Sequence, residues 1–380
     1  MKVGELVNFL ESLYISTKEN KVSLPSVLLL GAPGVGKSRS CRDLAKRIAS
    51  ITKKEFIDYN DIVADKIISD SSKYYVFCDF RLTEVEPSDL IGIPEKVNGS
   101  VRFAPLQWAS CLNRASGMLL LDEITNVQRE DVISAVYKLV LDRKAGFVPL
   151  NSDVLVIACG NKPEHSSIAR LLPNALLNRL LILDIDPPSI DEWKDWMDEK
   201  YGEKWDKRCY VFLKEVQAEE KRNYLLAIPK TQEGLEEFPT PRSWTRLSRL
   251  MWAGVQSNEV ITGSIGHEAG IRFISFMKVN IDIEELISNP ETFDSLSLDA
   301  KYMASFMLAA WCSRNSEQVN KVLKLVDRMA KFSKEFITLT CTNLTRDKLV
   351  IFIKELIKHN VNYERVLLEI AEVKSILTKH

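Results

Sequence analysis

The sequence predicts an α/β protein in which a parallel sheet flanked by helices is followed by a mostly helical half. Between residues 22 and 186, short apolar runs alternate with segments of helical periodicity, which is the pattern of a parallel sheet with crossover helices. Pro187 and Pro188 then interrupt this pattern. Beyond them, apolar residues recur at spacings of three and four, and β-like alternation is scarce.

The composition is that of an ordinary globular protein. The chain has 380 residues, of which 46% are apolar, with 52 acidic and 51 basic side chains. At about 150 residues per domain, this length predicts two or three domains. The overall net charge of −1 does not favour binding to nucleic acid or to an anionic membrane. The apolar runs are far shorter than a membrane span of roughly 18 residues, so we expect a cytoplasmic protein with reduced cysteines.

Five apolar runs are expected to form buried strands of the sheet. A helix over residues 5–16 is expected to pack on this sheet through Leu6, Phe9, Leu10 and Leu13, which share one helical face. Further helices are expected at 37–51 and 129–141. The strand runs are 27–30, 74–80, 118–121, 154–159 and 180–185.

A glycine-rich loop follows the first predicted strand and precedes a helix. Residues 31–38 read Gly-Ala-Pro-Gly-Val-Gly-Lys-Ser and match the phosphate-binding pattern GxxxxGK[ST] in its required context. Glycines let backbone N–H groups surround the β- and γ-phosphates of ATP, the lysine adds a positive charge and the serine hydroxyl can ligate Mg²⁺. The alternative is an accidental glycine turn. The expected nucleotide-binding residues are Ala32, Pro33, Gly34, Val35, Gly36, Lys37, Ser38 and Arg39.

Two carboxylates end the apolar run 118–121. Asp122 is placed to hold Mg²⁺ together with Ser38, and Glu123 to polarise an attacking water. The alternative is the start of a helix, where acidic residues are also favoured. The phosphate-binding loop upstream favours the catalytic interpretation.

Asn161 follows the run 154–159 within Gly160-Asn161-Lys162-Pro163. These residue types are typical of turns, and a turn alone would explain them. However, an amide at the tip of the strand next to the carboxylate strand would lie near the γ-phosphate and could orient water. We therefore expect Asn161 to be catalytic.

With these parts placed, the chain resembles an AAA+ ATPase, and within that superfamily the MoxR-like branch with a helix-2 insert. The resemblance covers nearly the whole chain and rests on three further segments. These are residues 79–94, the end of the insert hairpin at Phe103-Ala104-Pro105-Leu106-Gln107-Trp108, and the run from Val148 to Asn161. The insert hairpin is expected near 92–105, with its turn at Asn98-Gly99, a favoured hairpin pair.

The resemblance implies domain limits and roles for two arginines. It implies an AAA+ P-loop core over 1–186, an all-α lid over 187–254 and a C-terminal helical extension over 255–380. Arg179, in Ala175-Leu176-Leu177-Asn178-Arg179-Leu180, resembles the arginine finger that reaches a neighbouring subunit's γ-phosphate. Arg242 resembles the sensor-2 arginine of the lid. Asn178 stands where many relatives have Asp, Arg170 is a second candidate for the finger, and a solvated surface charge would also explain each arginine.

The function expected from this resemblance is Mg²⁺-dependent ATP hydrolysis by a homo-oligomeric ring, expected to be a hexamer, that remodels or matures a protein partner. The branch implies a partner with a von Willebrand factor A domain. One alternative is a nucleic-acid translocase or restriction-type motor on the same fold. Another is a scaffold that binds ATP without hydrolysing it, although the intact Asp122 and Glu123 argue against this.

Overall fold

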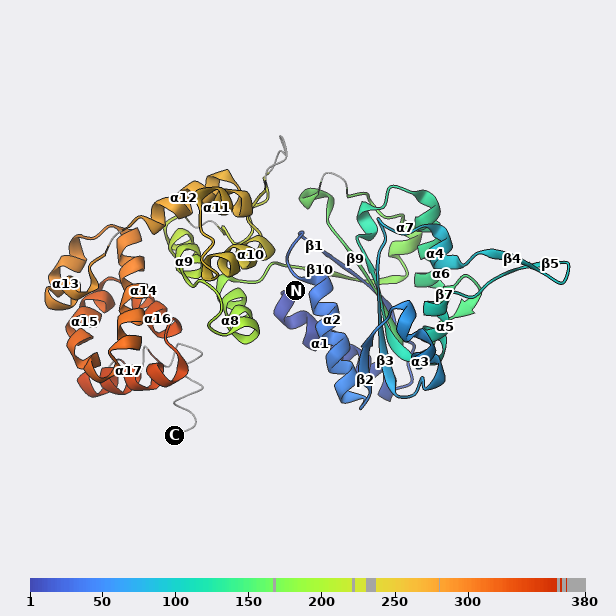
Figure 1. Cartoon of the computed structure of the whole chain (residues 1–380), viewed down its shortest axis with the longest axis horizontal. Helices are drawn as coiled ribbons and strands as arrows, with labels where there is room; N and C mark the ends of the chain where they lie inside the picture. Colours follow the sequence, from blue (N-terminus) through green and yellow to red (C-terminus); the bar gives the residue numbers. More distant parts are fainter. Residues whose placement is uncertain are drawn as a thin grey trace. The chain divides into compact units, whose positions relative to one another are not determined.

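The chain divides into two units, Met1–Glu192 and Trp193–His380. Figure 1 shows both in a computed structural model. The structure describes residues 1–166, 169–220, 223–229, 237–279 and 281–360, together with Tyr363 and Leu367. The first unit is α/β, and the described part of the second consists of helices and loops.

Six parallel strands form the sheet of the first unit in the order β10-β1-β9-β6-β3-β2. All five predicted strands are present. The sixth, β2, was not predicted, because it lies at the edge of the sheet and has no fully buried residue. The last strand, β10, is an edge strand and only Ile185 in it is buried, so the expectation of a buried strand there was wrong. The bounds are β1 Ser26–Gly31, β2 Glu55–Asp58, β3 Tyr74–Arg81, β6 Ser116–Asp122, β9 Val154–Gly160 and β10 Leu180–Ile185.

Helices cover both faces of this sheet (Figure 1). On one face α2 packs against β3, β6 and β9, and α1 packs against α2. On the other face α5 and α6 share an apolar core with alternate strand residues such as Leu28, Val76 and Leu119. Burial on both faces explains why the central strands are continuous apolar runs. The helices are α1 Val3–Glu19, α2 Lys37–Ile51, α3 Ala64–Ser69, α4 Pro87–Ile91, α5 Gln107–Arg114, α6 Glu130–Leu141 and α7 Asn174–Leu177.

The first helix is present and is longer than predicted. It buries Leu6, Leu10 and Tyr14. Phe9, which was expected on the packed face, is 39% exposed. Tyr14 replaces it in the contact and meets Tyr75 of β3 edge to face at 6.4 Å.

A two-stranded hairpin, β4 Pro94–Val97 with β5 Ser100–Phe103, projects from the body of the first unit (Figure 1). Its turn falls at the predicted Asn98-Gly99 pair, where both residues have positive φ, 51° and 80°. That backbone suits a two-residue hairpin turn. Phe103 at the base of the hairpin contacts Phe147, which lies in the turn between β7 Lys144–Ala145 and β8 Val148–Pro149.

A capping box follows the two prolines at the start of the next helix. Glu192 Oε2 accepts the N–H of Ser189 at 2.6 Å, and Ser189 Oγ accepts the N–H of Glu192 at 3.2 Å. Helix α8, Ile190–Tyr201, starts here. The boundary between the two units falls within its first turn.

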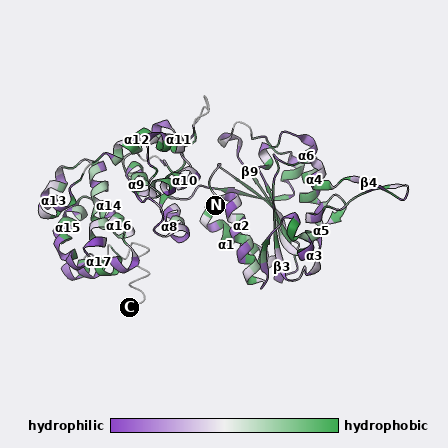
Figure 2. Ribbon diagram, viewed as in Figure 1, coloured by the Kyte–Doolittle hydropathy of each residue, from purple (hydrophilic) through white to green (hydrophobic). Residues whose placement is uncertain are grey.

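Helices build the described part of the second unit and confirm the predicted helical half. Figure 2 shows hydrophobic and hydrophilic residues alternating along them. Phe212 is in ring contact with Trp244, Phe273 and Phe276 at centroid distances of 5.8, 5.1 and 5.5 Å, and all four are buried. The helices are α9 Arg208–Glu220, α10 Pro241–Trp252, α11 Asn258–Ile265, α12 His267–Met277, α13 Ile283–Ser288, α14 Leu298–Arg314, α15 Leu323–Phe332, α16 Lys334–Thr342 and α17 Arg346–His359.

Both α12 and α14 pack on α9, so the helices after residue 255 share a core with the helices before it. Lys214 of α9 also pairs with Glu335 of α16 at 3.7 Å. Residues 361–380, other than Tyr363 and Leu367, lie outside the described residues. Among the described residues, no helix combines the length and apolar character needed to span a membrane.

Candidate active site

The glycine-rich loop joins the carboxyl end of β1 to the amino end of α2. Gly34 and Gly36 have φ values of 75° and 109°, which side chains disfavour. A Cβ on Gly31 would lie 2.6 Å from the carbonyl oxygen of Ile185 in β10, so no larger residue fits there. The first backbone N–H groups of α2 have no acceptor within the helix. The loop and helix end therefore suit a phosphate group.

Lys37 is buried in the core of this site, with 8% of its surface exposed. Its ammonium donates to the carbonyl oxygens of Gly31 and Ala32, both at 2.9 Å, and to Oδ1 of Asn161 at 3.1 Å. These bonds hold a positive charge against the loop. They also bring Asn161, from the end of β9, to the phosphate loop.

Ser38 and Asp122 are in direct contact. Ser38 Oγ donates to Asp122 Oδ2 at 2.5 Å, and Asp122 Oδ1 accepts the N–H of Glu123 at 2.9 Å. Burial raises the pKa of nearby Asp79, and the negative charge of Asp122 is the second largest cause of this rise. Mg²⁺ prefers hard oxygen ligands. The hydroxyl of Ser38 and the carboxylate of Asp122 supply such ligands side by side.

Glu123 has a strained backbone and a carboxylate held by the end of the neighbouring strand β3. Its φ is 61°, in the left-handed region that costs a non-glycine residue roughly 1–3 kcal/mol. Oε2 accepts a hydrogen bond from Thr83 Oγ1 at 3.2 Å, and Oε1 lies 3.5 Å from Arg81 Nε. Arg81 also pairs with Glu84 at 2.7 Å. Such strain is common in active sites.

The structure thus brings Lys37, Ser38, Asp122 and Asn161 together at the carboxyl edge of the sheet, with Glu123 next to them. Three contacts were not predicted from the sequence. Arg81 and Thr83 each contact Glu123, and the hydroxyl of Thr125 accepts the N–H of Asn161 at 2.8 Å. They depend on which strands are neighbours, and no local motif carries that information.

The four arginines predicted to act at a nucleotide lie in different places and have different contacts. Arg39 pairs with Asp43 one turn along α2, at 3.0 Å. Arg179 is exposed just before β10, at the amino edge of the sheet. Arg170, the second candidate for the finger, donates from Nη1 to the carbonyl oxygen of Gln128 at 3.2 Å. Arg242 is exposed in the first turn of α10 and belongs to the second unit. The roles of all four at a nucleotide stay predictions.

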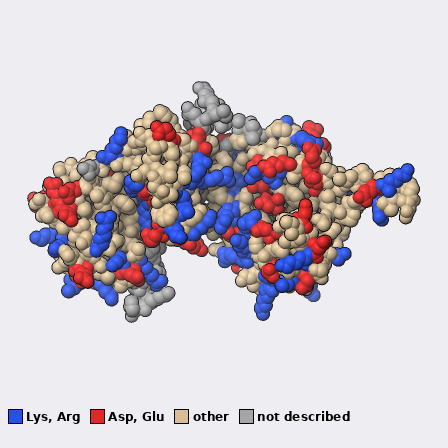
Figure 3. Space-filling view, viewed as in Figure 1, with Lys and Arg blue, Asp and Glu red and all other residues tan. Residues whose placement is uncertain are grey.

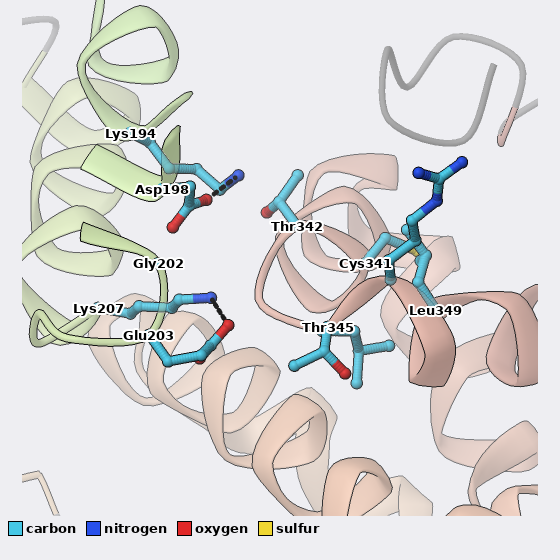
Figure 4. Close-up of a pocket in the computed structure, with 11 residues that line it drawn as sticks. Lys194, Asp198, Gly202, Glu203, Lys207, Cys341, Thr342, Thr345 and Leu349 are labelled. Atoms are coloured by element: carbon cyan, nitrogen blue, oxygen red, sulfur yellow. Dashed lines mark ion pairs between the residues drawn. The ribbon is translucent and has the colours of Figure 1, made fainter. Parts of the chain in front are cut away.

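A separate cavity of about 320 Å³ lies in the second unit, between the end of α8 and the helices α16 and α17. Lys194 pairs with Asp198 at 3.0 Å and Lys207 with Glu203 at 3.8 Å on one side, and Thr342 faces them (Figure 4). No residue predicted for the active site lines this cavity. Two lysines of the lining, Lys194 and Lys207, are thus each paired with a carboxylate of the same lining.

The sheet, the phosphate loop and the following helices define the class of fold: a P-loop α/β core, in which helices flank a parallel sheet, followed by a helical region. This confirms the predicted α/β fold with a helical C-terminal region. No protein-family model matches the chain, and no curated protein matches it.

The solved structures similar to this chain include several of RuvB from Thermotoga maritima. One point mutant of RuvB has 15% identity, a TM-score of 0.34 and coverage of 75% of this chain and 74% of that one. A second point mutant has 15% identity, a TM-score of 0.33 and coverage of 77% and 78%. A structure described as a Holliday junction branch migration motor has 17% identity, a TM-score of 0.31 and coverage of 75% and 74%. At these values, neither activity nor partner transfers to this chain.

Proposed function

We propose that this protein hydrolyses ATP to ADP and phosphate with Mg²⁺. One observation carries the proposal: Ser38 Oγ lies 2.5 Å from Asp122 Oδ2, beside a buried lysine on a glycine-rich loop. A nucleoside triphosphate and its metal ion are bound by such a set of groups: a glycine-rich loop, an ammonium, a hydroxyl and a carboxylate. The helical region and the resemblance to AAA+ ATPases agree with it.

Each group has a part in the proposed reaction. The loop N–H groups and Lys37 bind and orient the β- and γ-phosphates. Ser38 and Asp122 would hold Mg²⁺, which when bound neutralises phosphate charge. Glu123 takes the proton of the attacking water after its carboxylate leaves Thr83, and Asn161 orients that water through its side-chain amide.

We further propose that the active unit is a ring of identical subunits that remodels a protein partner. Support comes from the resemblance to MoxR-like ATPases, in which Arg179 would complete a neighbour's site and Arg242 would contact nucleotide from the lid. The same resemblance supports a partner with a von Willebrand factor A domain. The near-neutral chain, with 51 basic and 52 acidic side chains, supports a protein partner over nucleic acid.

The test separates binding from turnover. Lys37→Ala should abolish ATP binding, because the loop loses its charge. Glu123→Gln should still bind ATP but hydrolyse it roughly 100-fold or more slowly, the usual effect of losing a water-activating group. Binding is measured by calorimetry with ATP and Mg²⁺, and turnover by phosphate release. Equal loss of binding in both variants would contradict these roles.

A further inference from the structure

Thr125 lies in a 3₁₀ turn, Ile124–Asn126, that directly follows the carboxylates Asp122 and Glu123. It is 3% exposed. Its hydroxyl oxygen accepts the backbone N–H of Asn161 at 2.8 Å, and its carbonyl oxygen accepts the backbone N–H of Arg170 at 2.7 Å. One buried residue therefore binds the chain at two points after β9.

The contact with β9 is tight as well as polar. A Cβ on Gly160 would lie 2.7 Å from Cγ2 and 3.0 Å from Oγ1 of Thr125. It would also lie 3.3 Å from Cγ2 of Ile124. Only glycine lets the end of β9 approach this turn so closely. The bond from the N–H of Arg170 to the carbonyl oxygen of Thr125 anchors the backbone of the same residue.

Asn161 needs a fixed position because its side chain reaches Lys37, with Oδ1 accepting the ammonium at 3.1 Å. Its backbone N–H is the group next to that side chain, and Thr125 is its hydrogen-bond acceptor. If the acceptor is lost, the strand end relaxes and the amide moves relative to the phosphate loop. A misplacement of about 1 Å at a reacting group can cost ~10²-fold in rate.

We propose that Thr125 is a positioning residue for ATP hydrolysis: its hydroxyl sets the amide of Asn161 against Lys37 and the γ-phosphate. The inference rests on the proposed ATPase function. It adds that the turn after the carboxylates and the water-orienting amide form one rigid group. In this role Thr125 acts through its hydrogen bond to Asn161.

Two matched pairs of variants isolate the hydroxyl. Thr125→Val keeps both branches of the side chain and removes the acceptor. Thr125→Ser and Thr125→Ala both lose the Cγ2 methyl and differ only in the hydroxyl. If Thr125→Val fails to fold, the serine and alanine pair still answers the question.

The expected result is a split between turnover and binding. Variants without the hydroxyl should lose ~10-fold or more in kcat relative to their matched partners, because the water is misoriented. Affinity for a non-hydrolysable ATP analogue should change less than about threefold, since the phosphate loop is intact. In an Asn161→Ala background, Thr125→Val should cost less than about twofold, because residues that act as a unit are not additive.

Hydrogen exchange gives a second readout that does not need activity. The segment that contains Asn161 should exchange faster in Thr125→Val than in wild type, and faster in Thr125→Ala than in Thr125→Ser. Equal exchange and equal turnover within both pairs would overturn the role of Thr125. A wild-type protein that does not hydrolyse ATP would overturn the proposed function instead, and the exchange rates would still decide whether Thr125 positions Asn161.

Discussion

The residues of the candidate site are polar groups bonded to one another across three strand ends, and Lys37 among them is buried. Lys37 is bonded to acceptors at the ends of β1 and β9, and Ser38 to Asp122 at the end of β6. A buried ammonium is costly unless it is hydrogen-bonded. The phosphates of a bound nucleotide would add negative charge beside Lys37 and ligands for the loop N–H groups, so nucleotide binding should stabilise the first unit.

The hydroxyl of Ser38 can be tested as a metal ligand. Ser38→Ala should weaken Mg²⁺-dependent ATP binding and raise the Mg²⁺ concentration at half-maximal turnover, because one oxygen donor is lost. Ser38→Thr is the matched control, since it keeps the hydroxyl and should stay close to wild type. The measurement is a Mg²⁺ titration of turnover at saturating ATP. An unchanged titration in Ser38→Ala would remove Ser38 from the metal site.

Sequence motifs predicted those site residues that lie close together in the sequence, because short separations along the chain fix how they are arranged in space. The loop from Gly31 to Ser38 is local, so its pattern alone places Lys37 and Ser38 beside one another. Contacts between strands are different, because they depend on strand order and register. Nothing in the sequence near Glu123 indicates that Thr83 would contact it, or that Thr125 would bond to Asn161.

At the scale of helices and strands, burial explains which elements the sequence predicted. β6 and β9 are covered on both faces, and their apolar runs are unmistakable. β2 is an edge strand of four residues with two exposed positions, so it lacks such a run. The packed face of α1 was only partly predicted, because helical periodicity does not say whether Phe9 or Tyr14 meets the sheet.

An ion pair at the end of α1 offers a test of how this helix is attached. Lys18 bonds to Asp153, and Tyr14 Oη donates to the carbonyl oxygen of Asp153 at 3.3 Å. Desolvation raises the pKa of Asp153, but the hydrogen bond and charge of Lys18 outweigh it, and the net pKa is lowered. A lowered carboxyl pKa stabilises the folded state above the unfolded value of about 3.9, and this stability is lost as pH falls through the folded value.

Lys18→Met should therefore lower the free energy of unfolding near neutral pH and have little effect in acid. The loss should be about 1 kcal/mol or less, because both side chains are partly exposed and screened by solvent. Urea unfolding at neutral pH and at a series of pH values below about 3.9 measures the difference, because the effect should shrink as the Asp153 carboxylate of the folded state is protonated. Lys144→Met, at an exposed lysine, is the control. A Lys18→Met effect that is as large at low pH as at neutral pH would contradict the assignment.

At the scale of the whole molecule, the prediction is that the active unit contains several subunits. Arg179 is exposed and precedes β10 at the amino edge of the sheet, whereas Lys37 and Asp122 lie at the carboxyl edge, as expected of a group that serves a neighbour. An arginine supplied in trans is worth 10³ or more in rate in well-studied cases, about 4 kcal/mol. Both Arg179→Ala and Lys37→Ala subunits should therefore be nearly inactive alone.

Mixing the two variants should restore part of the turnover, since one subunit supplies the arginine and the other the nucleotide site. Turnover is measured against the mixing ratio, and ATP-dependent assembly by light scattering. The control is each variant mixed with itself at the same total concentration. An inactive mixture that still assembles would show that Arg179 is not the finger, and Arg170→Ala would then be mixed in its place.

The last prediction concerns what the assembled protein acts on. The hairpin β4–β5 carries both signs of charge close together (Figure 3). Glu95 of β4 lies opposite Arg102 of β5 in the strand register. Val101 on it is 70% exposed. Mixed charge with exposed apolar groups suits a protein surface better than a phosphate backbone, which repels carboxylates and favours basic and neutral hydrogen-bond donors.

We therefore expect a partner with a von Willebrand factor A domain to bind the assembled protein and change its ATPase rate. Replacing residues 97–101 with a short Gly-Ser turn should weaken this effect while leaving turnover without partner unchanged, because the hairpin projects away from the sheet. Turnover is measured with the partner, with single- and double-stranded DNA and with RNA, each across a salt series. Stimulation by nucleic acid alone, falling steeply with salt as counterion release requires, would instead favour a nucleic-acid motor.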